Sequence, residues 1–470
     1  IVRKHVQAIV TRCKTTGEKF TDGDFGPSEE DATGARSLYG NPPKKPGAVG
    51  STQYPEPDAL RWDRPMYAAD HSMQIMSADG QPTEAAEPED EDGAEIDGAD
   101  DEQRGLPWCR RGELFKASAP GGSGASAGDV VQGALGDCWF LGALSVLATN
   151  ERQLTKVFWP ESNPEQFRDQ GMFVLRFFKD AMWHYVIIDD RIPVYDNDEG
   201  LPVFAKCHDK DELWVLFVEK AYAKLHGSYK SLIGGFVHNA LADLTGYVPE
   251  LLITKKGHQG YTSLIPKREG EGSKSYAGLD SSSSKGKHKR KHKKSSRRVA
   301  GSSEKALTED VIAEMNLVWQ KLERRHHEYA ALMGCSIQPA PGASKKEAEG
   351  PSGLRLMHAY GLLDIGEISR SDEREAELEK LYKENEVAYE KKEAGSTQRL
   401  VLLRNPWGYG EWKGLWSDCV DTYFERQVYN PEINAKFHMG GNADGAEVNS
   451  NDGSFYMPFE KWYDIFTHVF

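Results

Sequence analysis

A single cysteine, set between a glycine-rich turn and an apolar segment, constrains this chain most. The residues from Gln132 to Leu141 read Gln-Gly-Ala-Leu-Gly-Asp-Cys-Trp-Phe-Leu, and the run 139–147 predicts a helix. Cys138 then lies at a helix N-terminus, where the helix dipole stabilises a thiolate, the nucleophilic form of cysteine. Gln132 could donate an amide N–H to an oxyanion. Because a lone cysteine is usually only a small buried residue, this interpretation requires partners elsewhere in the chain.

Two later segments supply such partners. The apolar segment 356–365 predicts a strand that carries His358. The segment 400–408 reads Leu-Val-Leu-Leu-Arg-Asn-Pro-Trp-Gly and predicts a strand that ends at Asn405. The order Cys, His, Asn along a chain is typical of papain-like cysteine proteases.

The wording of these motifs resembles the calpain protease core more narrowly. Gln-Gly-x-Leu-Gly-Asp-Cys-Trp, His-Ala-Tyr and Arg-Asn-Pro-Trp-Gly occur together and in order. The segments 212–229 and 415–418 also resemble calpains, and the Leu-His-Gly-Ser-Tyr wording is nearest the plant-type, membrane-anchored members. The resemblance covers most of residues 106–470. It implies an α+β, papain-like fold with two lobes, in which a helical lobe carries Cys138 and an antiparallel sheet lobe carries His358 and Asn405.

The resemblance and the composition together divide the chain into three parts. Residues 1–105 form a lead-in segment, within which the acidic run 84–102 is expected to be a disordered insertion. Residues 106–234 form the first protease lobe, with a β-hairpin at 172–188 and an amphipathic helix at 212–225. Residues 235–470 form the second lobe, after a hinge at Gly234 and Gly235.

Two insertions interrupt the second lobe, at about 266–306 and 369–397. The first contains the basic run 285–298, which is too rich in Lys, Ser and Gly to form a core. That run could direct nuclear import or bind anionic lipid or nucleic acid, and a solvated loop is an equal alternative. In the second insertion, i,i+4 charge pairs over 372–385 favour an exposed helix.

The resemblance implies a role for each catalytic residue. Cys138 would be the nucleophile, and His358 would deprotonate it and then protonate the leaving amine. Asn405 would hold the imidazole in the useful tautomer, and Gln132 with the Cys138 N–H would bind the oxyanion. The function predicted is calcium-regulated, limited proteolysis of flexible protein segments by an intracellular cysteine endopeptidase.

Three further side chains near these motifs have plainer alternatives. Trp407 resembles the tryptophan that wedges the family's cleft in the inactive form, and ordinary core packing is its alternative. His184 and His226 are interpreted as packed or solvated residues rather than as catalytic groups. Gly361 follows His-Ala-Tyr where a serine is common in calpains, and we expect no loss of catalysis from it.

The resemblance also implies one regulatory calcium ion in each lobe. Calcium binds several carboxylate and carbonyl oxygens on loops. In the first lobe the expected ligands are Gly122, Gly124, Asp129 and Glu212. In the second lobe they are Glu411, Asp418 and Asp452. Ser454 stands where many animal calpains have a glutamate ligand, and Ala127 stands where they carry the arginine that pairs with it, so the second site is expected to be weakened and the calcium coupling altered.

Composition limits the other classes of function. The formal net charge of -15 predicts no overall attraction to nucleic acid. The six cysteines form no CxxC pair, which favours a reducing, intracellular and cytoplasmic location. No apolar stretch is long enough to span a bilayer, and no EF-hand loop is present. A chain that begins at Ile1 predicts a fragment, so a membrane anchor or flanking regulatory domains could lie outside it.

Three alternatives to a calcium-regulated protease are kept. A catalytically silent, calpain-like scaffold would share the fold, but the presence of all four catalytic residue types argues against it. A transglutaminase-like acyl transferase would share the cysteine and histidine, but not the asparagine or the wording around Cys138. A polyanion-binding protein would act through residues 285–298, with salt-sensitive binding that survives Cys138→Ala.

Overall fold

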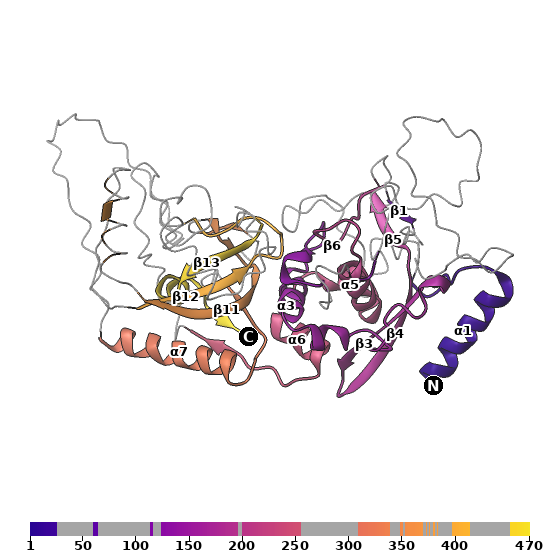
Figure 1. Ribbon diagram of the computed structural model, residues 1–470, viewed down its shortest axis with the longest axis horizontal. Helices are drawn as coiled ribbons and strands as arrows, with labels where there is room; N and C mark the ends of the chain where they lie inside the picture. Colours follow the sequence, from indigo (N-terminus) through magenta and orange to yellow (C-terminus); the bar gives the residue numbers. More distant parts are fainter. Residues whose placement is uncertain are drawn as a thin grey trace, which may run out of the picture.

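The computed structural model describes two packed bodies that share one long contact (Figure 1). We call them the helical lobe, built around α3 (Cys138–Ala148), α5 (Trp214–Leu225) and α6 (Val237–Thr245), and the sheet lobe, built around β11 (Ala359–Ser369), β12 (Thr397–Arg404) and β13 (Ser454–Pro458). The structure describes residues 1–25, 60–63, 113–115, 124–195, 200–254, 309–338, 348–350, 353–369, 397–413 and 452–470, with isolated positions between 373 and 383. The acidic run 84–102, the insertion 266–306 and the basic run 285–298 lie outside these residues.

The helical lobe combines short helices with small antiparallel sheets. Its helices and 3-10 turns are η3 (Ala127–Asp129), α3 (Cys138–Ala148), α4 (Glu151–Thr155), η4 (Arg168–Gln170), α5 (Trp214–Leu225), η5 (Tyr229–Leu232) and α6 (Val237–Thr245). Its strands are β2 (Val130–Val131), β3 (Met172–Lys179), β4 (Met182–Asp189), β5 (Ile192–Tyr195) and β6 (Lys206–Cys207). Two lead-in elements join it: α1 (Val2–Thr16), and β1 (Leu60–Asp63), which pairs with β5.

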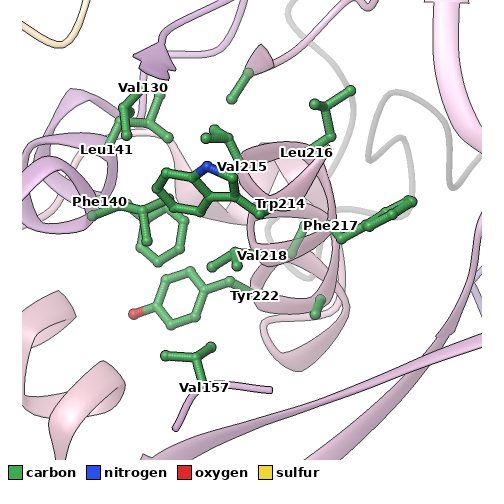
Figure 2. Packing of buried hydrophobic residues seen from close by; sticks show 14 of the residues in the cluster. Val130, Phe140, Leu141, Val157, Trp214, Val215, Leu216, Phe217, Val218 and Tyr222 are labelled. Atoms are coloured by element: carbon green, nitrogen blue, oxygen red, sulfur yellow. The ribbon is translucent and has the colours of Figure 1, made fainter. Parts of the chain in front are cut away.

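Aromatic packing between α3 and α5 forms the centre of the helical lobe (Figure 2). Nearly every residue of α3 is buried, so the helix has no polar face and must run through the core. The rings of Phe140 and Tyr222 stack with centroids 4.1 Å apart. Trp214 and Phe217 of α5 are fully buried beside them. Cys138 therefore lies at the start of a helix that is surrounded by apolar contacts.

The hairpin predicted over 172–188 is present as β3 and β4. The two strands pair along their whole length, and Asp180 and Ala181 connect them with positive φ angles of 51° and 61°. Two consecutive left-handed residues define the turn that best matches the right-handed twist of a hairpin. His184 lies in β4 with Nε2 3.1 Å from the Lys179 carbonyl oxygen, and thus serves the hairpin.

The sheet lobe contains a six-stranded antiparallel sheet in the order β13-β12-β11-β8-β14-β7. The strands are β7 (Leu252–Ile253), β8 (Met333–Ser336), β11 (Ala359–Ser369), β12 (Thr397–Arg404), β13 (Ser454–Pro458) and β14 (His468–Val469). Between β8 and β11 in the sequence, the short strands β9 (Ala348–Glu349) and β10 (Arg355–Leu356) form a separate antiparallel pair. Two helices, α7 (Glu309–His327) and α10 (Phe459–Ile465), bury Trp319 and Trp462 with the sheet residues.

The α+β, papain-like architecture expected from the motifs is confirmed, and two details differ. We expected His358 inside a strand, whereas it lies just before β11, after Met357 with its positive φ of 56°. Helix α6 lies beyond the boundary expected after Gly234, yet its buried Val237, Ala240 and Leu244 belong to the core of the helical lobe. The packing of α6 therefore does not favour a division there, and the domain limits stay a prediction.

The remaining helices fit the expectations only in part. The described positions within 372–385 are helical and exposed, in line with the exposed helix predicted there. The long helix α7 has no counterpart in the motif-based expectation. None of the helices in the described part of the chain is both long and apolar enough to cross a bilayer.

Candidate active site

The nucleophile end of the site is a helix N-terminus reached by a tight turn. Cys138 is the first residue of α3 and is half-buried. Before it, Gly133 passes so close to Phe204 that a Cβ would lie 2.0 Å from the Phe204 carbonyl oxygen, so only glycine fits. The turn is further held where Gly234 donates its N–H to the Gly136 carbonyl at 3.0 Å. These contacts fix the direction in which the Cys138 side chain leaves the helix.

The base end of the site is a fully buried histidine and asparagine pair. His358 Nε2 lies 2.8 Å from Asn405 Oδ1, and both residues are 1% exposed or less. Asn405 Oδ1 also accepts the Trp407 N–H at 3.1 Å. Asn405 Nδ2 donates to the carbonyls of Tyr409 and Gly410, both at 2.8 Å. These bonds identify the oxygen of the Asn405 amide, so Nε2 must carry the proton and Nδ1 is the nitrogen that can act as a base.

Two aromatic rings enclose the imidazole of His358. The Trp407 ring and the Tyr360 ring each lie 5.1 Å from it, centroid to centroid, in edge-on arrangements. Arg355 touches both walls: its guanidinium carbon lies 4.8 Å above the Trp407 ring, and its backbone N–H donates to the Tyr360 hydroxyl at 2.7 Å. Trp407 therefore packs on the histidine, which it shields from water.

Helix α3 and strand β11, which carry the two ends of the site, pack glycine against glycine. A Cβ on Gly142 would lie 3.7 Å from the Gly361 N–H nitrogen, and a Cβ on Gly361 would lie 2.9 Å from Val146 Cγ2. Gly142 is one helical turn after Cys138, and Gly361 follows His358 by three residues. The first turn of α3 thus lies along the start of β11, with Cys138 and His358 at the same end of the contact. The absence of the serine common at position 361 has a structural reason here, since a side chain would push the helix away.

Gln132 lies in the segment that joins the two ends. Its backbone N–H donates to the Pro406 carbonyl at 2.8 Å, directly beside Asn405. Its side-chain Nε2 donates to the Leu135 carbonyl at 2.5 Å, which uses one of the two amide protons. The other proton, and the Cys138 N–H at the N-terminus of α3, are the donors that could stabilise a negatively charged oxygen.

Two buried carboxyl groups that the sequence did not predict lie near Cys138. Asp137 is fully buried and lies close to Glu219 of α5, which accepts the Ala205 N–H at 3.0 Å. Burial raises the pKa of Asp137 to about 7 and raises the pKa of Glu219 well above its usual value, which the neighbouring carboxyl raises further. Two neighbouring carboxyl groups that are buried away from water cannot both be ionised near neutral pH. Because they come from positions far apart in the chain, no local pattern could have revealed the pair.

The structure places five of the seven expected calcium ligands, and Gly122 and Asp418 lie outside the described residues. In the helical lobe, Asp129 Oδ2 accepts the Ser126 N–H at 2.5 Å, and burial raises the Asp129 pKa. Glu212 is 2% exposed, and it and Asp129 both face Cys207. One buried and one half-buried carboxylate are the oxygen ligands that a hard cation prefers. Gly124, with a φ of 79°, lies on the same loop.

The expected ligands in the sheet lobe lie close to a positively charged side chain of the protein, that of Arg404. Glu411 Oε1 accepts the Gly453 N–H, and Asp452 Oδ1 accepts the Ser454 N–H, both at 2.7 Å. Arg404 lies 3.7 Å from Asp452 Oδ1 and interacts electrostatically with Glu411. Within the ranges that the structure describes, no group of three or more His, Cys, Asp or Glu is arranged to hold a metal ion. The individual calcium sites therefore stay predictions.

Comparisons with known proteins identify the family of this chain. A family model described as "Calpain family cysteine protease" matches residues 88–470, so the chain belongs to the calpain family. It is 28% identical to human Calpain-9 over 77% of this chain and 38% of the relative. It is 29% identical to Caenorhabditis elegans Calpain-5 (77% and 46%) and 26% identical to the chicken Calpain-2 catalytic subunit (76% and 37%). The chain spans less than half the length of these relatives. All three are animal proteins, so the nearer likeness to plant-type calpains stays a prediction.

Proposed function

We propose that this chain is the catalytic core of a calcium-regulated cysteine endopeptidase that cuts flexible segments of protein substrates. The observation that carries the proposal is the buried hydrogen bond between His358 Nε2 and Asn405 Oδ1 beside a helix that begins with a cysteine. A histidine needed only for packing does not require an asparagine whose own oxygen is fixed by a backbone N–H. Membership of the calpain family supports the same chemistry.

The proposed reaction divides peptide hydrolysis into two steps. His358 Nδ1 takes the proton from Cys138, whose sulfur forms a bond to the scissile carbonyl carbon. The negative charge on the carbonyl oxygen is stabilised by the Cys138 N–H and the Gln132 side chain. The C–N bond then breaks as the protonated imidazole gives its proton to the leaving amine. Water, deprotonated by His358, displaces the sulfur and releases the acid product.

Calcium is proposed as the regulator, as is general in this family. When bound, it would neutralise the loop carboxylates and favour the arrangement in which the lobes meet. Asp129 and Glu212, with carbonyls of Gly122 and Gly124, would hold it in the helical lobe. Glu411, Asp418 and Asp452 would hold it in the sheet lobe, where Arg404 already supplies charge and should weaken the site.

Cleavage of casein at a series of free calcium concentrations tests the proposal. We expect calcium-dependent cleavage by the chain and none by Cys138→Ser. Cleavage that needs Cys138 but not calcium would support the protease function and contradict regulation by calcium. No cleavage under any condition, with the fold intact by circular dichroism, would favour the catalytically silent scaffold.

The location and the finer partners are also proposals. The described cysteines, Cys13, Cys138, Cys207 and Cys335, are free thiols, which supports an intracellular and cytoplasmic site of action. Binding of anionic lipid or nucleic acid by residues 285–298 is tested by deleting that run and measuring salt-dependent binding. Flanking regulatory domains are tested by comparing this chain with longer products of the same gene.

A further inference from the structure

A buried arginine lies where the helical lobe meets the sheet lobe. Arg404 is the last residue of β12 and is 1% exposed. Its Nη1 donates to the Asp452 carbonyl at 2.6 Å and to Ser454 Oγ at 2.9 Å. Its Nη2 donates to the Gly128 carbonyl at 2.7 Å and to the Val130 carbonyl at 3.2 Å. One guanidinium nitrogen thus serves each lobe.

The acceptors belong to the two different lobes. Val130 pairs with Cys207 in β2 and β6, which belong to the helical lobe. Ser454 pairs with Arg404 itself in β13 and β12, at one edge of the six-stranded sheet. The planar guanidinium spans both sets because its N–H groups diverge in a fixed fork. A lysine amine carries its donors on a single atom and cannot reach all four acceptors.

Arg404 also stands at one end of a continuous seam between the lobes. Two residues beyond Val130 on one side and two beyond Arg404 on the other, the seam continues with the bond from the Gln132 N–H to the Pro406 carbonyl. It ends where Gly408 packs on Val131, with a Cβ position 3.3 Å from Val131 Cγ2. Segment 128–132 therefore runs along segment 404–408. This seam carries Gln132 on one side and Asn405 on the other.

The charges around Arg404 come from both lobes. Burial lowers the Arg404 pKa, while Asp452, Asp129 and Glu411 oppose that effect. Asp129 belongs to the helical lobe, and Glu411 and Asp452 belong to the sheet lobe. The sequence lacks the arginine and glutamate that would pair across the lobes at positions 127 and 454, and the hydroxyl of Ser454 instead accepts from Arg404.

We propose that Arg404 is a positioning residue that fastens the two lobes together, so that Gln132 and Cys138 face His358 and Asn405. It touches neither the substrate nor the reacting atoms. Its effect on activity rests on the proposed protease function, but the lobe contact itself does not. The prediction is that loss of the fork opens the seam while each lobe stays folded.

Hydrogen exchange at the Gln132 amide tests this directly, because that N–H is bonded across the seam. The experiment uses the full chain carrying Cys138→Ser, with saturating calcium, so that no cleavage is required. We expect Arg404→Lys to speed exchange at Gln132 by about 10-fold or more, the value expected for loss of hydrogen bonds to a charged group. Amides of the β3–β4 hairpin should not change.

Arg399→Lys is the matched control, since Arg399 lies on the same strand but makes its contacts inside the sheet lobe. It bonds to Glu367 and Asn316 and stacks on Trp319. We expect it to leave exchange at Gln132 unchanged. If Arg404→Lys and Arg399→Lys behave alike at Gln132, the proposal is overturned.

Two further measurements keep the test decisive. If Arg404→Lys does not fold, Ser454→Ala removes a single acceptor of the fork and should still speed Gln132 exchange several-fold, about the effect of one hydrogen bond. In the active chain, Arg404→Lys should lower kcat by about 10-fold with KM within about two-fold, because the catalytic groups and not the substrate contacts are displaced. Unchanged exchange in both Arg404→Lys and Ser454→Ala would contradict the proposal, whatever the activity.

Discussion

The proposed base, His358, and the proposed nucleophile, Cys138, are held in contrasting ways. On the base side, the amide of Asn405 uses both its oxygen and its nitrogen in hydrogen bonds, and rings cover the imidazole of His358. On the nucleophile side, Cys138 sits on a helix held by apolar packing above a pair of buried acids. The orientation of His358 is therefore fixed by hydrogen bonds. The position of Cys138 depends instead on the packing of the whole α3 helix and on the protonation of Asp137 and Glu219.

This contrast suggests where the site tolerates change. Removing a directed bond on the base side should affect the chemical step and leave most of the fold intact. Shifting the α3 helix should affect both the chemistry and the stability, because the helix is part of the core. The four predictions below separate these cases, from the largest expected effect to the smallest.

The largest effect is expected on the base side. Asn405→Ala removes the acceptor that fixes the His358 tautomer and should lower kcat by about 100-fold or more, with a small change in KM. Steady-state cleavage of a peptide substrate measures it. Gln398 lies on the strand that precedes Asn405 and contacts Glu460, and Gln398→Ala is the control that should retain full activity. Equal losses in the two variants would show that Asn405 acts only through the strand.

The next effect tests how closely the helix must approach the sheet. Gly361→Ala places a Cβ 2.9 Å from Val146 Cγ2 and should push α3 away from β11. We expect a loss of about 1–3 kcal/mol in the free energy of unfolding. Because Cys138 moves with α3, kcat/KM should also fall, by about 10-fold.

The double variant Gly361→Ala with Val146→Ala supplies the control for this steric argument. It removes the methyl group that the new Cβ would meet, so it should recover part of the lost activity. Urea unfolding and peptide cleavage measure the two quantities. A double variant that is merely the sum of its single changes would show that the glycine contact does not set the approach.

The buried acids make the nucleophile side sensitive to pH. A carboxyl whose pKa is raised holds its proton in the folded state where the unfolded chain has lost it. For Asp137, stability should therefore fall as the pH rises from about 4 to about 7 and then level off. Asp137→Asn removes this cost, so its stability relative to the parent should be higher at pH 8 than at pH 5, by on the order of 1–3 kcal/mol.

Urea unfolding in the Cys138→Ser background measures this difference. Glu219→Gln should behave in the same direction, because its amide oxygen can still accept the Ala205 N–H. Glu151→Gln, at an exposed acid on α4, is the control and should show no such dependence. A flat pH profile for Asp137→Asn relative to the parent would mean that the two acids are solvated.

The smallest effect is expected from the contact between Arg355 and the Trp407 ring, which packs on His358. Arg355→Met removes the cation above Trp407 and should lower kcat by about three-fold, in keeping with a partly exposed cation–π contact. Arg355→Lys keeps a cation there and should recover most of the rate. The backbone bond from Arg355 to Tyr360 is unaffected by either change. Equal rates for the Met and Lys variants would remove the role of the charge.

The sequence allowed the site to be predicted further than the fold around it. The helix after Cys138, the hairpin and the strand expected to end at Asn405 all carry short-range patterns. The structure contains each of them, with the strand ending one residue earlier, at Arg404. Helices α6 and α7 were not anticipated, because they carry none of the quoted motifs. The place of His358 before its strand, rather than within it, follows from the left-handed Met357, which hydrophobic pattern does not reveal.

What the sequence could not reveal were contacts between distant residues. The carbonyls of Gly128 and Val130 that accept from Arg404 lie more than 270 positions away in the chain. They are backbone groups, so no side-chain pattern marks them. The pairing of Asp137 with Glu219 likewise depends on how α5 packs under α3. Such groups become visible only when the fold has brought them together.

Covalent labelling of the cysteines tests most directly the claim that Cys138 and His358 act as one unit. The chain would be treated with a peptidyl epoxide, with saturating calcium, and the modified residue found by peptide mass mapping. We predict one label per chain, on Cys138, and a rate reduced by about 10-fold or more in His358→Ala, because general-base activation typically contributes at least that much. Labelling at other cysteines, or an unchanged rate in His358→Ala, would contradict the account.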